Sequence, residues 1–260
     1  MRRRLPLPIL VAALIGGAFV VLPVVALVAR APWGRFGDVL AGEGARTALR
    51  LSLEVSLAAA ALSVLFGVPL AWVLARREFR GRAVLRAMVV LPIVLPPVVA
   101  GVGLLEALGR RGMFGGWLDR HFGIQLTFTT TGAIVAATFV SMPLVILATE
   151  AGFRGLDRRY EQAAGVLGAS PGYTLRRVVL PMVSPQLAAG AVLAWARALG
   201  EFGATITFAG NLQGRTQTVP LAVYQQLQTD RDGAVALSLV LVVVSIAVLV
   251  ALRERIMGAR

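Results

Sequence analysis

The chain of 260 residues is 57% hydrophobic and only 15% charged, a composition that excludes an ordinary soluble domain and favours a membrane protein. Its net charge of +13 comes from 26 basic residues, all of them arginine, against 13 acidic ones. The absence of lysine excludes a P-loop nucleotide site, and the absence of cysteine with a single histidine excludes disulfides and zinc clusters. We therefore expect no catalytic residue, no metal site and no cofactor in this chain.

Six mainly apolar stretches have the length of a membrane-crossing helix, since about 20 apolar residues span the hydrocarbon core of a bilayer. The first is longer than the apolar part of a signal peptide, so we interpret it as an anchor. The third contains Pro92, Pro96 and Pro97. We predict an all-α polytopic membrane protein with a single transmembrane domain over residues 1–260. The predicted spans are approximately 5–29, 51–75, 87–107, 132–150, 187–208 and 233–252.

The distribution of arginines predicts how the spans are oriented. With both termini in the cytoplasm, sixteen arginines fall in cytoplasmic segments and nine on the opposite side. Positive charge favours the cytoplasmic side, so we expect a multi-pass membrane protein with both termini inside. Because the arginines are dispersed over short loops on two sides, the basic charge does not indicate nucleic-acid binding.

The cytoplasmic segment 151–186 has the pattern of two short helices joined by a turn. Helix-forming residues run from Asp157 to Leu167, Gly168 breaks the pattern, and Ser170-Pro171 reads as an N-cap followed by the first helical residue. The second helix is expected to end at Leu180-Pro181. This hairpin either presents a surface to a partner or is a solvated loop. The stretch Gly168 to Gly172 also fits the hydrolase pattern Gly-x-Ser-x-Gly, but a serine hydrolase is disfavoured because the chain's histidine, His121, is predicted on the opposite side.

Two charged residues lie within the fifth span. Arg197 and Glu201 are four residues apart, hence on one helix face, and each is costly in lipid without a partner. They form either a neutralised pair that holds the span in place or a pair along a translocation route, where Arg197 attracts an oxyanion. Hydroxyls on such a route are expected from Thr138, Ser141 and Thr205, although helical hydroxyls more often bond their own backbone.

The cytoplasmic hairpin resembles the "EAA" loop of ABC-importer permeases. The resemblance rests on Gln162-Ala163-Ala164, Gly168 and Val178-x-Leu180-Pro181 at the family's spacing; the usual Glu position holds Gln162, with Glu161 one residue earlier. It implies the type I importer permease fold and a coupling helix that docks on a separate ATPase. The residues that it assigns to coupling are Glu161, Gln162, Ala163, Ala164, Gly168, Ser170, Leu180 and Pro181.

Three further stretches resemble permeases for tetrahedral oxyanions. Residues 91–101 are similar to the third span of molybdate permeases, and residues 196–205 to the fifth span of molybdate, tungstate and sulfate permeases. Residues 209–220 resemble the external loop of the molybdate subgroup. In that loop Asn211, Gly214 and Arg215 serve either turn formation or contact with a substrate-delivering protein.

The resemblance implies a transport subunit that is not an enzyme and that carries molybdate into the cytoplasm, and it leaves tungstate open as a further substrate. Its implied partners are a second copy in a homodimer, two cytoplasmic ABC ATPase subunits and a periplasmic or extracellular molybdate-binding protein, all at the lipid bilayer of the bacterial inner membrane. A sulfate or thiosulfate permease remains an alternative. So does an ion-driven secondary transporter, although no internal repeat is present and only Glu201 lies deep in a span.

Overall fold

The computed structural model describes residues 6–257, and every regular element in that part of the chain is helical. Residues 1–5 and 258–260, which include four of the arginines used to predict orientation, lie outside the description. The helices are α1 Leu7–Ala29, α2 Phe36–Ala41, α3 Glu43–Arg76, α4 Arg82–Val94, α5 Pro97–Leu108, α6 Gly115–Phe122, α7 Thr130–Gly155, α8 Arg159–Val166, α9 Pro171–Thr174, α10 Leu180–Met182, α11 Ser184–Leu199, α12 Gly203–Phe208, α13 Val219–Thr229 and α14 Arg231–Met257. A π-helical turn, Leu175–Val179, joins α9 to α10.

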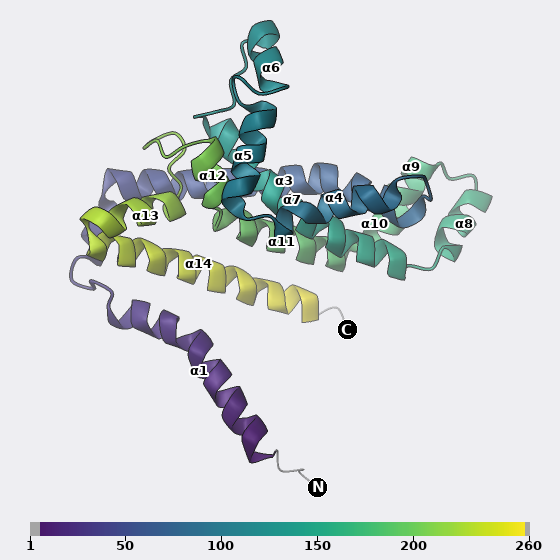
Figure 1. Cartoon of the computed structure of the whole chain (residues 1–260). Helices are drawn as coiled ribbons and strands as arrows, with labels where there is room; N and C mark the ends of the chain where they lie inside the picture. Colours follow the sequence, from purple (N-terminus) through teal and green to yellow (C-terminus); the bar gives the residue numbers. More distant parts are fainter. Residues whose placement is uncertain (1–5, 258–260) are drawn as a thin grey trace.

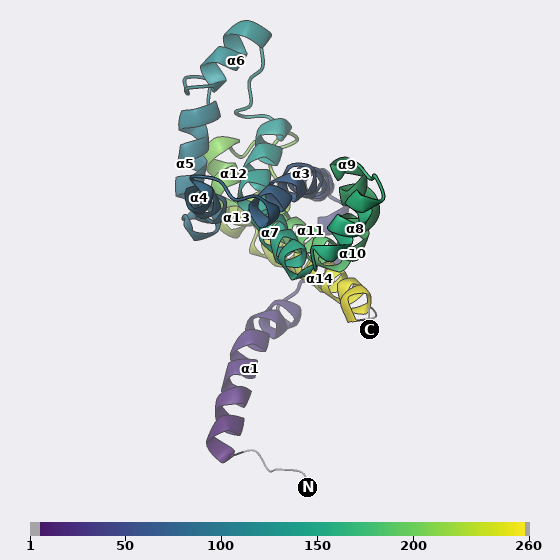
Figure 2. The ribbon, with the colours of Figure 1, turned by 90° about the vertical axis from the view of Figure 1, so that its right-hand side faces the viewer.

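The centre of the molecule is a bundle in which α3 and α11 pack against α7, with α14 alongside (Figures 1 and 2). Small residues bring α3 and α7 together: Ala59, Ser63 and Gly67 lie at intervals of four and are all buried. The hydroxyl of Ser63 lies 3.2 Å from that of Ser141 on α7. Such a stripe allows close backbone approach and one interhelical hydrogen bond, as expected for helices packed in a membrane.

The predicted third span, residues 87–107, is broken in the middle. It is divided between α4 and α5, because Leu95 is extended and Pro96 caps the second helix. A residue before proline is pushed out of the helical region, so the run Leu95-Pro96-Pro97 ends one helix and starts another. α5 then packs on α12 and leads to α6, which projects from the bundle (Figures 1 and 2).

The predicted fifth span, residues 187–208, is likewise two helices. α11 ends at Leu199 and α12 begins at Gly203, with Gly200, Glu201 and Phe202 between them. On its other side α11 meets α9 to α10 at Val183 with a bend of 78°.

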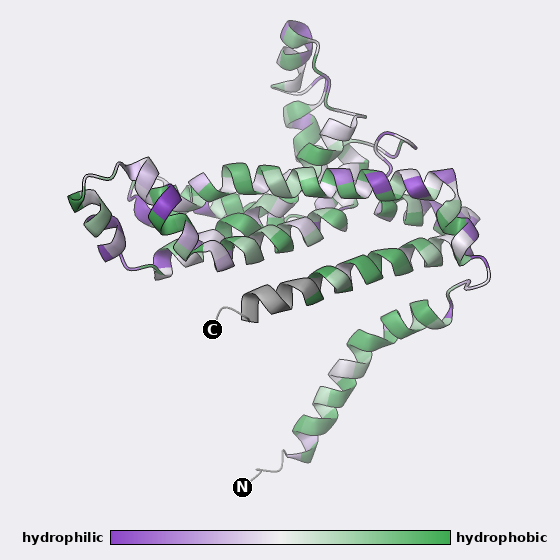
Figure 3. Ribbon diagram, turned by 180° about the vertical axis from the view of Figure 1, so that it is seen from behind, coloured by the Kyte–Doolittle hydropathy of each residue, from purple (hydrophilic) through white to green (hydrophobic). Residues whose placement is uncertain are grey.

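The predicted count of six spans is therefore not confirmed. Within residues 6–257 four helices are long and apolar enough to cross a membrane, namely α1, α3, α7 and residues 231–248 of α14, or five if the pair bent at Val183 is one span. In Figure 3 these helices are mostly coloured as hydrophobic, while hydrophilic residues gather near helix ends. α1 contributes no buried residue and diverges from the bundle (Figure 1).

Candidate functional site

The hairpin after α7 turns at Gly168, as the sequence predicts. Gly168 has φ +82°, a left-handed conformation that glycine adopts without the strain other residues incur. After the turn the Ser170 hydroxyl accepts a hydrogen bond of 3.3 Å from the backbone N–H of Tyr173, and Pro171 begins α9. The N-cap prediction for Ser170 is confirmed. Capping explains this serine without hydrolase chemistry.

The base of the hairpin packs against the core of the bundle, and its tip is exposed. Leu180 packs against the core cluster that includes Phe153 and Val183, and the helix that contains it ends at Met182, one residue beyond the expected end. At the tip Val166 is 88% exposed and Leu167 is 87% exposed. Large apolar side chains this exposed are available for contact with another protein or with lipid.

A groove of about 640 Å³ runs inside the hairpin. Among the predicted coupling residues, Ala164, Gly168 and Ser170 line it. Gln162, Ala163 and Pro181 are exposed on the same hairpin. Glu161, by contrast, does not line this groove.

Glu161 instead binds the end of a membrane-crossing helix. Its carboxylate Oε1 lies 2.6 Å from Nη2 of Arg76, the last residue of α3, and the two side chains are only 22% and 10% exposed. The same Nη2 donates a hydrogen bond of 3.2 Å to the carbonyl of Leu156, between α7 and α8. Arg76 thus joins the end of α3 to Leu156, which precedes α8, and to Glu161, which lies in the first turn of α8. Nothing in the spacing of the sequence predicts this pairing over 85 residues.

A second ion cluster lies at the same end of the bundle. Glu150 of α7 is 1% exposed, and its carboxylate lies 2.8 Å from Arg154 and 3.6 Å from Arg86 of α4. Both oxygens lack a hydrogen-bond partner within the described residues, so these two arginines compensate the burial of the charge. The four-residue spacing of Glu150 and Arg154 is the signal that sequence reasoning overlooked.

Arg197 and Glu201 are brought together as their spacing predicts, at the break between α11 and α12. Glu201 is 2% exposed; one carboxylate oxygen pairs with Arg197, and Oε1 accepts a hydrogen bond of 2.7 Å from the backbone N–H of Ala204. The acid therefore satisfies a free N–H at the start of α12 as well as the arginine. The Arg197 side chain is 34% exposed, so the pair has one buried and one accessible member.

Most of the hydroxyls predicted along the pathway are hydrogen-bonded within the protein or buried. Thr138 donates to the carbonyl of Ile134 at 2.7 Å, within its own helix. Ser141 is fully buried against Ser63, and Thr205 is 1% exposed. Ser141 and Thr205 are therefore buried, whereas Thr138 and Arg197 are partly exposed.

The loop between α12 and α13 is a series of tight turns. Gly210 and Gly214 both have positive φ, +77° and +79°. Asn211 donates a hydrogen bond of 3.4 Å to Gln225 of α13. The carbonyl of Arg215 accepts one of 2.8 Å from Thr130 at the start of α7, leaving the arginine side chain exposed. The loop is thus held to two helices.

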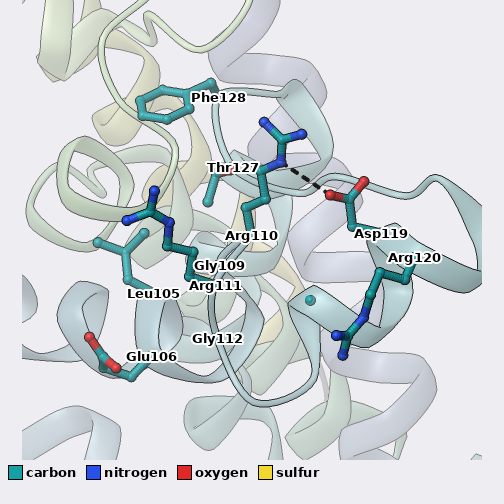
Figure 4. Close-up of a pocket in the computed structure, with 11 residues that line it drawn as sticks. Leu105, Glu106, Gly109, Arg110, Arg111, Gly112, Asp119, Arg120, Thr127 and Phe128 are labelled. Atoms are coloured by element: carbon teal, nitrogen blue, oxygen red, sulfur yellow. Dashed lines mark hydrogen bonds and ion pairs between the residues drawn. The ribbon is translucent and has the colours of Figure 1, made fainter.

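A basic pocket of about 820 Å³ lies beside this loop, between the end of α5 and α6 (Figure 4). Arg110, Arg111 and Arg120 line it with two acids, and Arg110 turns toward Asp119 at 3.1 Å. The hydrogen bond from Gln125, followed by that from Arg110, holds the pKa of Asp119 below its usual value. Phe128, in the strained conformation φ +60°, also lines it. Sequence reasoning singled out none of these residues.

The sequence matches a known protein family over most of its length. Residues 67–258 match the family of binding-protein-dependent transport system inner membrane components. The chain belongs to this family. Members are transport components, so the chain is a multi-pass permease of the inner membrane and not an enzyme.

The chain is also similar to individual permeases for molybdenum and for sulfate. The chain is 47% identical over 253 residues to the molybdenum transport system permease protein ModB of Mycobacterium tuberculosis, covering 96% of this chain and 95% of the relative. It is 36% identical to the sulfate transport system permease protein CysT of Escherichia coli, covering 88% and 83%. Among solved structures, a bacterial ABC transporter that imports the polysaccharide alginate aligns over 96% of both chains with a TM-score of 0.73 at 19% identity, which establishes the shared fold.

Proposed function

We propose that the chain is the membrane-spanning subunit of an ATP-driven importer that carries molybdate, and tungstate as well, into the cytoplasm. The observation that carries this proposal is the 47% identity to a molybdenum permease over nearly the full length of both chains. The identity to the sulfate permease, 36%, supports that alternative less. An ion-driven secondary transporter is not favoured, because the fold is that of ABC importers.

The structure supports a mechanism in which a partner supplies the energy. The exposed Val166 and Leu167 at the hairpin tip provide an apolar surface for an ATPase subunit. The ion pair between Glu161 and Arg76 transmits displacement of α8 to α3, which packs along α7 and α11. In the proposed assembly two copies of the chain, each with one ATPase, enclose the route. The hairpin and both termini face the cytoplasm, and a molybdate-binding protein delivers the anion to the loops on the opposite side.

Arg197 is the residue best placed to meet the anion. Its side chain is one-third exposed, while Glu201 holds the guanidinium in position and partly neutralises its charge. A tetrahedral dianion is attracted by such a partly neutralised arginine without being bound too tightly to leave. The broken helix provides free backbone groups at the same depth, as in other transporters with discontinuous helices.

The test is uptake of labelled molybdate by vesicles that contain the chain, its ATPase and its binding protein. We expect ATP-dependent uptake that excess tungstate inhibits and excess sulfate does not. Uptake of labelled sulfate with no competition by molybdate would establish the alternative. Uptake without an ATPase subunit would contradict the importer mechanism altogether.

A further inference from the structure

A small basic pocket lies near the hairpin, where α3 and α7 end and α4 begins. It measures about 250 Å³ and is lined by the last turn of α3, the loop to α4 with the first residue of α4, and the last turn of α7 with the segment after it. The lining residues are Ala75, Arg76, Glu78, Arg82, Arg154, Leu156 and Arg158. Neither the coupling function nor the translocation route uses Arg82 or Arg158.

The charge in and around this pocket is positive and incompletely compensated. Arg76 is paired with Glu161, and Arg154 shares Glu150 with Arg86. Arg82 and Arg158 form no ion pair within residues 6–257. With these neighbours and Glu78 included, the pocket and its surroundings contain five arginines and three glutamates. Two positive charges are therefore left without a balancing acid.

One buried donor in the pocket also lacks a partner. The side chain of Arg76 is 10% exposed, and its Nε atom is buried with no hydrogen-bond acceptor among the described residues. A buried guanidinium N–H without an acceptor is costly, and native structures usually satisfy it with protein, water or a bound group. Arginine matches the geometry of phosphate oxygens particularly well, since its planar fork donates two parallel hydrogen bonds. The unmet donor and the excess charge both indicate a bound anion.

The surroundings of the pocket favour an anion attached to lipid. The pocket lies at the ends of α3 and α7, two helices that cross the membrane, so it is at the level of the headgroups. On α4, Val84 and Met88 are 61% and 58% exposed and four residues apart, an apolar surface that begins two residues after Arg82. Basic pockets between membrane helices on the cytoplasmic side commonly hold anionic headgroups, while the acyl chains follow adjacent apolar surface.

We propose that this pocket is a binding site for a phosphate group, carried by an anionic phospholipid of the cytoplasmic leaflet. Arg82 and Arg158 supply the charges that are free to meet it, and Arg76 supplies the buried donor. Since Arg76 also holds Glu161, the bound headgroup lies next to the ion pair that attaches the hairpin to α3. The proposal is independent of which oxyanion is transported.

The test compares lipid retention by the full-length chain and three variants. The chain is purified from micelles of mixed phosphatidylglycerol and phosphatidylcholine, and bound lipid is identified by native mass spectrometry. We expect preferential retention of phosphatidylglycerol, reduced about tenfold in the double variant R82Q/R158Q, since two charges near the headgroup are removed. The single variants R82Q and R158Q show intermediate losses. R80Q is the matched control, because Arg80 lies in the same loop, is exposed and does not line the pocket.

A second measurement separates a lipid headgroup from free phosphate. Thermal unfolding is followed in phosphatidylcholine micelles, with inorganic phosphate or phosphatidylglycerol added. Stabilisation by phosphatidylglycerol alone, lost in R82Q/R158Q, supports the lipid site; stabilisation by inorganic phosphate, lost in the same variant, supports an anion site filled from solution. Equal lipid retention by wild type and both single variants overturns the proposal, as does a loss in R80Q as large as in R82Q. The single variants remove no ion pair of the structure, so they keep the test decisive if the double variant fails to fold.

Discussion

Glu161 of α8 lies 2.6 Å from Arg76 at the end of α3, with both side chains largely shielded from solvent. This contact is a direct link between the hairpin and a helix that crosses the membrane. Motion of the hairpin relative to the bundle must either carry Arg76 along or break the pair. Glu161, which lies one residue before the position where the family usually has glutamate, therefore has a definite structural partner in Arg76.

Replacing either member of this pair should weaken coupling. We expect R76Q and E161Q each to reduce transport-stimulated ATP hydrolysis, and the double variant to be no worse than the more impaired single variant. The pair's interaction free energy in a double-mutant cycle should be about 1 kcal/mol, measured by unfolding of the purified chain. R77Q, at the adjacent exposed position, is the control. Additive losses would show that the two residues act separately.

The turn of the hairpin depends on a glycine at 168. Its conformation, φ +82°, costs an L-residue about 1 kcal/mol, although a Cβ at this position would meet nothing within 4 Å. We expect G168A to lower the coupled ATPase rate moderately and G168V to lower it strongly, because a β-branched side chain resists the left-handed region more. G165A is the matched control: Gly165 is helical with equally open surroundings, so alanine there should leave coupling intact. Normal coupling in G168V would refute a requirement for this turn.

Glu201 should contribute through both of its contacts. E201A removes the partner of Arg197 and the acceptor for the Ala204 N–H, and we expect it to destabilise the chain by about 2 kcal/mol. E201Q keeps an acceptor oxygen and should cost about half as much, on the order of 1 kcal/mol. Thermal unfolding in detergent measures both. Identical losses in the two variants would mean that the cap on α12 contributes nothing.

The two variants should also separate stability from transport. If the pair tunes Arg197 as proposed, E201Q should bind molybdate more tightly and turn over more slowly, because the arginine regains its full charge. The measurement is the concentration dependence of uptake. A change in stability with unaltered uptake parameters would leave the pair a purely structural feature.

The contact between α5 and α12 depends on a glycine at 101. A Cβ built there would lie 2.6 Å from the Cβ of Thr207, whereas one on Gly103, on the same helix, would meet nothing within 4 Å. We expect G101A to destabilise the chain by about 2 kcal/mol through overpacking, and G103A to be neutral or slightly stabilising. Unfolding of the two variants under identical conditions checks this. Equal stabilities would indicate that α5 and α12 are not held as described.

Local features of the molecule were determined by the sequence alone. The Gly168 turn, the Ser170 cap and the pairing of Arg197 with Glu201 involve residues within four positions of each other, so spacing and backbone preference suffice to predict them. The helical character of the chain follows from the length of its apolar stretches, because lipid offers no alternative partners to the backbone.

Only the tertiary structure decided which distant residues meet and where long helices break. Hydropathy does not distinguish one continuous span from two shorter helices, so the breaks at Leu95 and at residues 200–202 divided two predicted spans. The pairing of Arg76 with Glu161, the burial of Glu150 between two arginines and the basic pocket at the ends of α3, α4 and α7 join segments up to 85 residues apart. Such pairs depend on the register of packed helices, which short-range patterns do not specify.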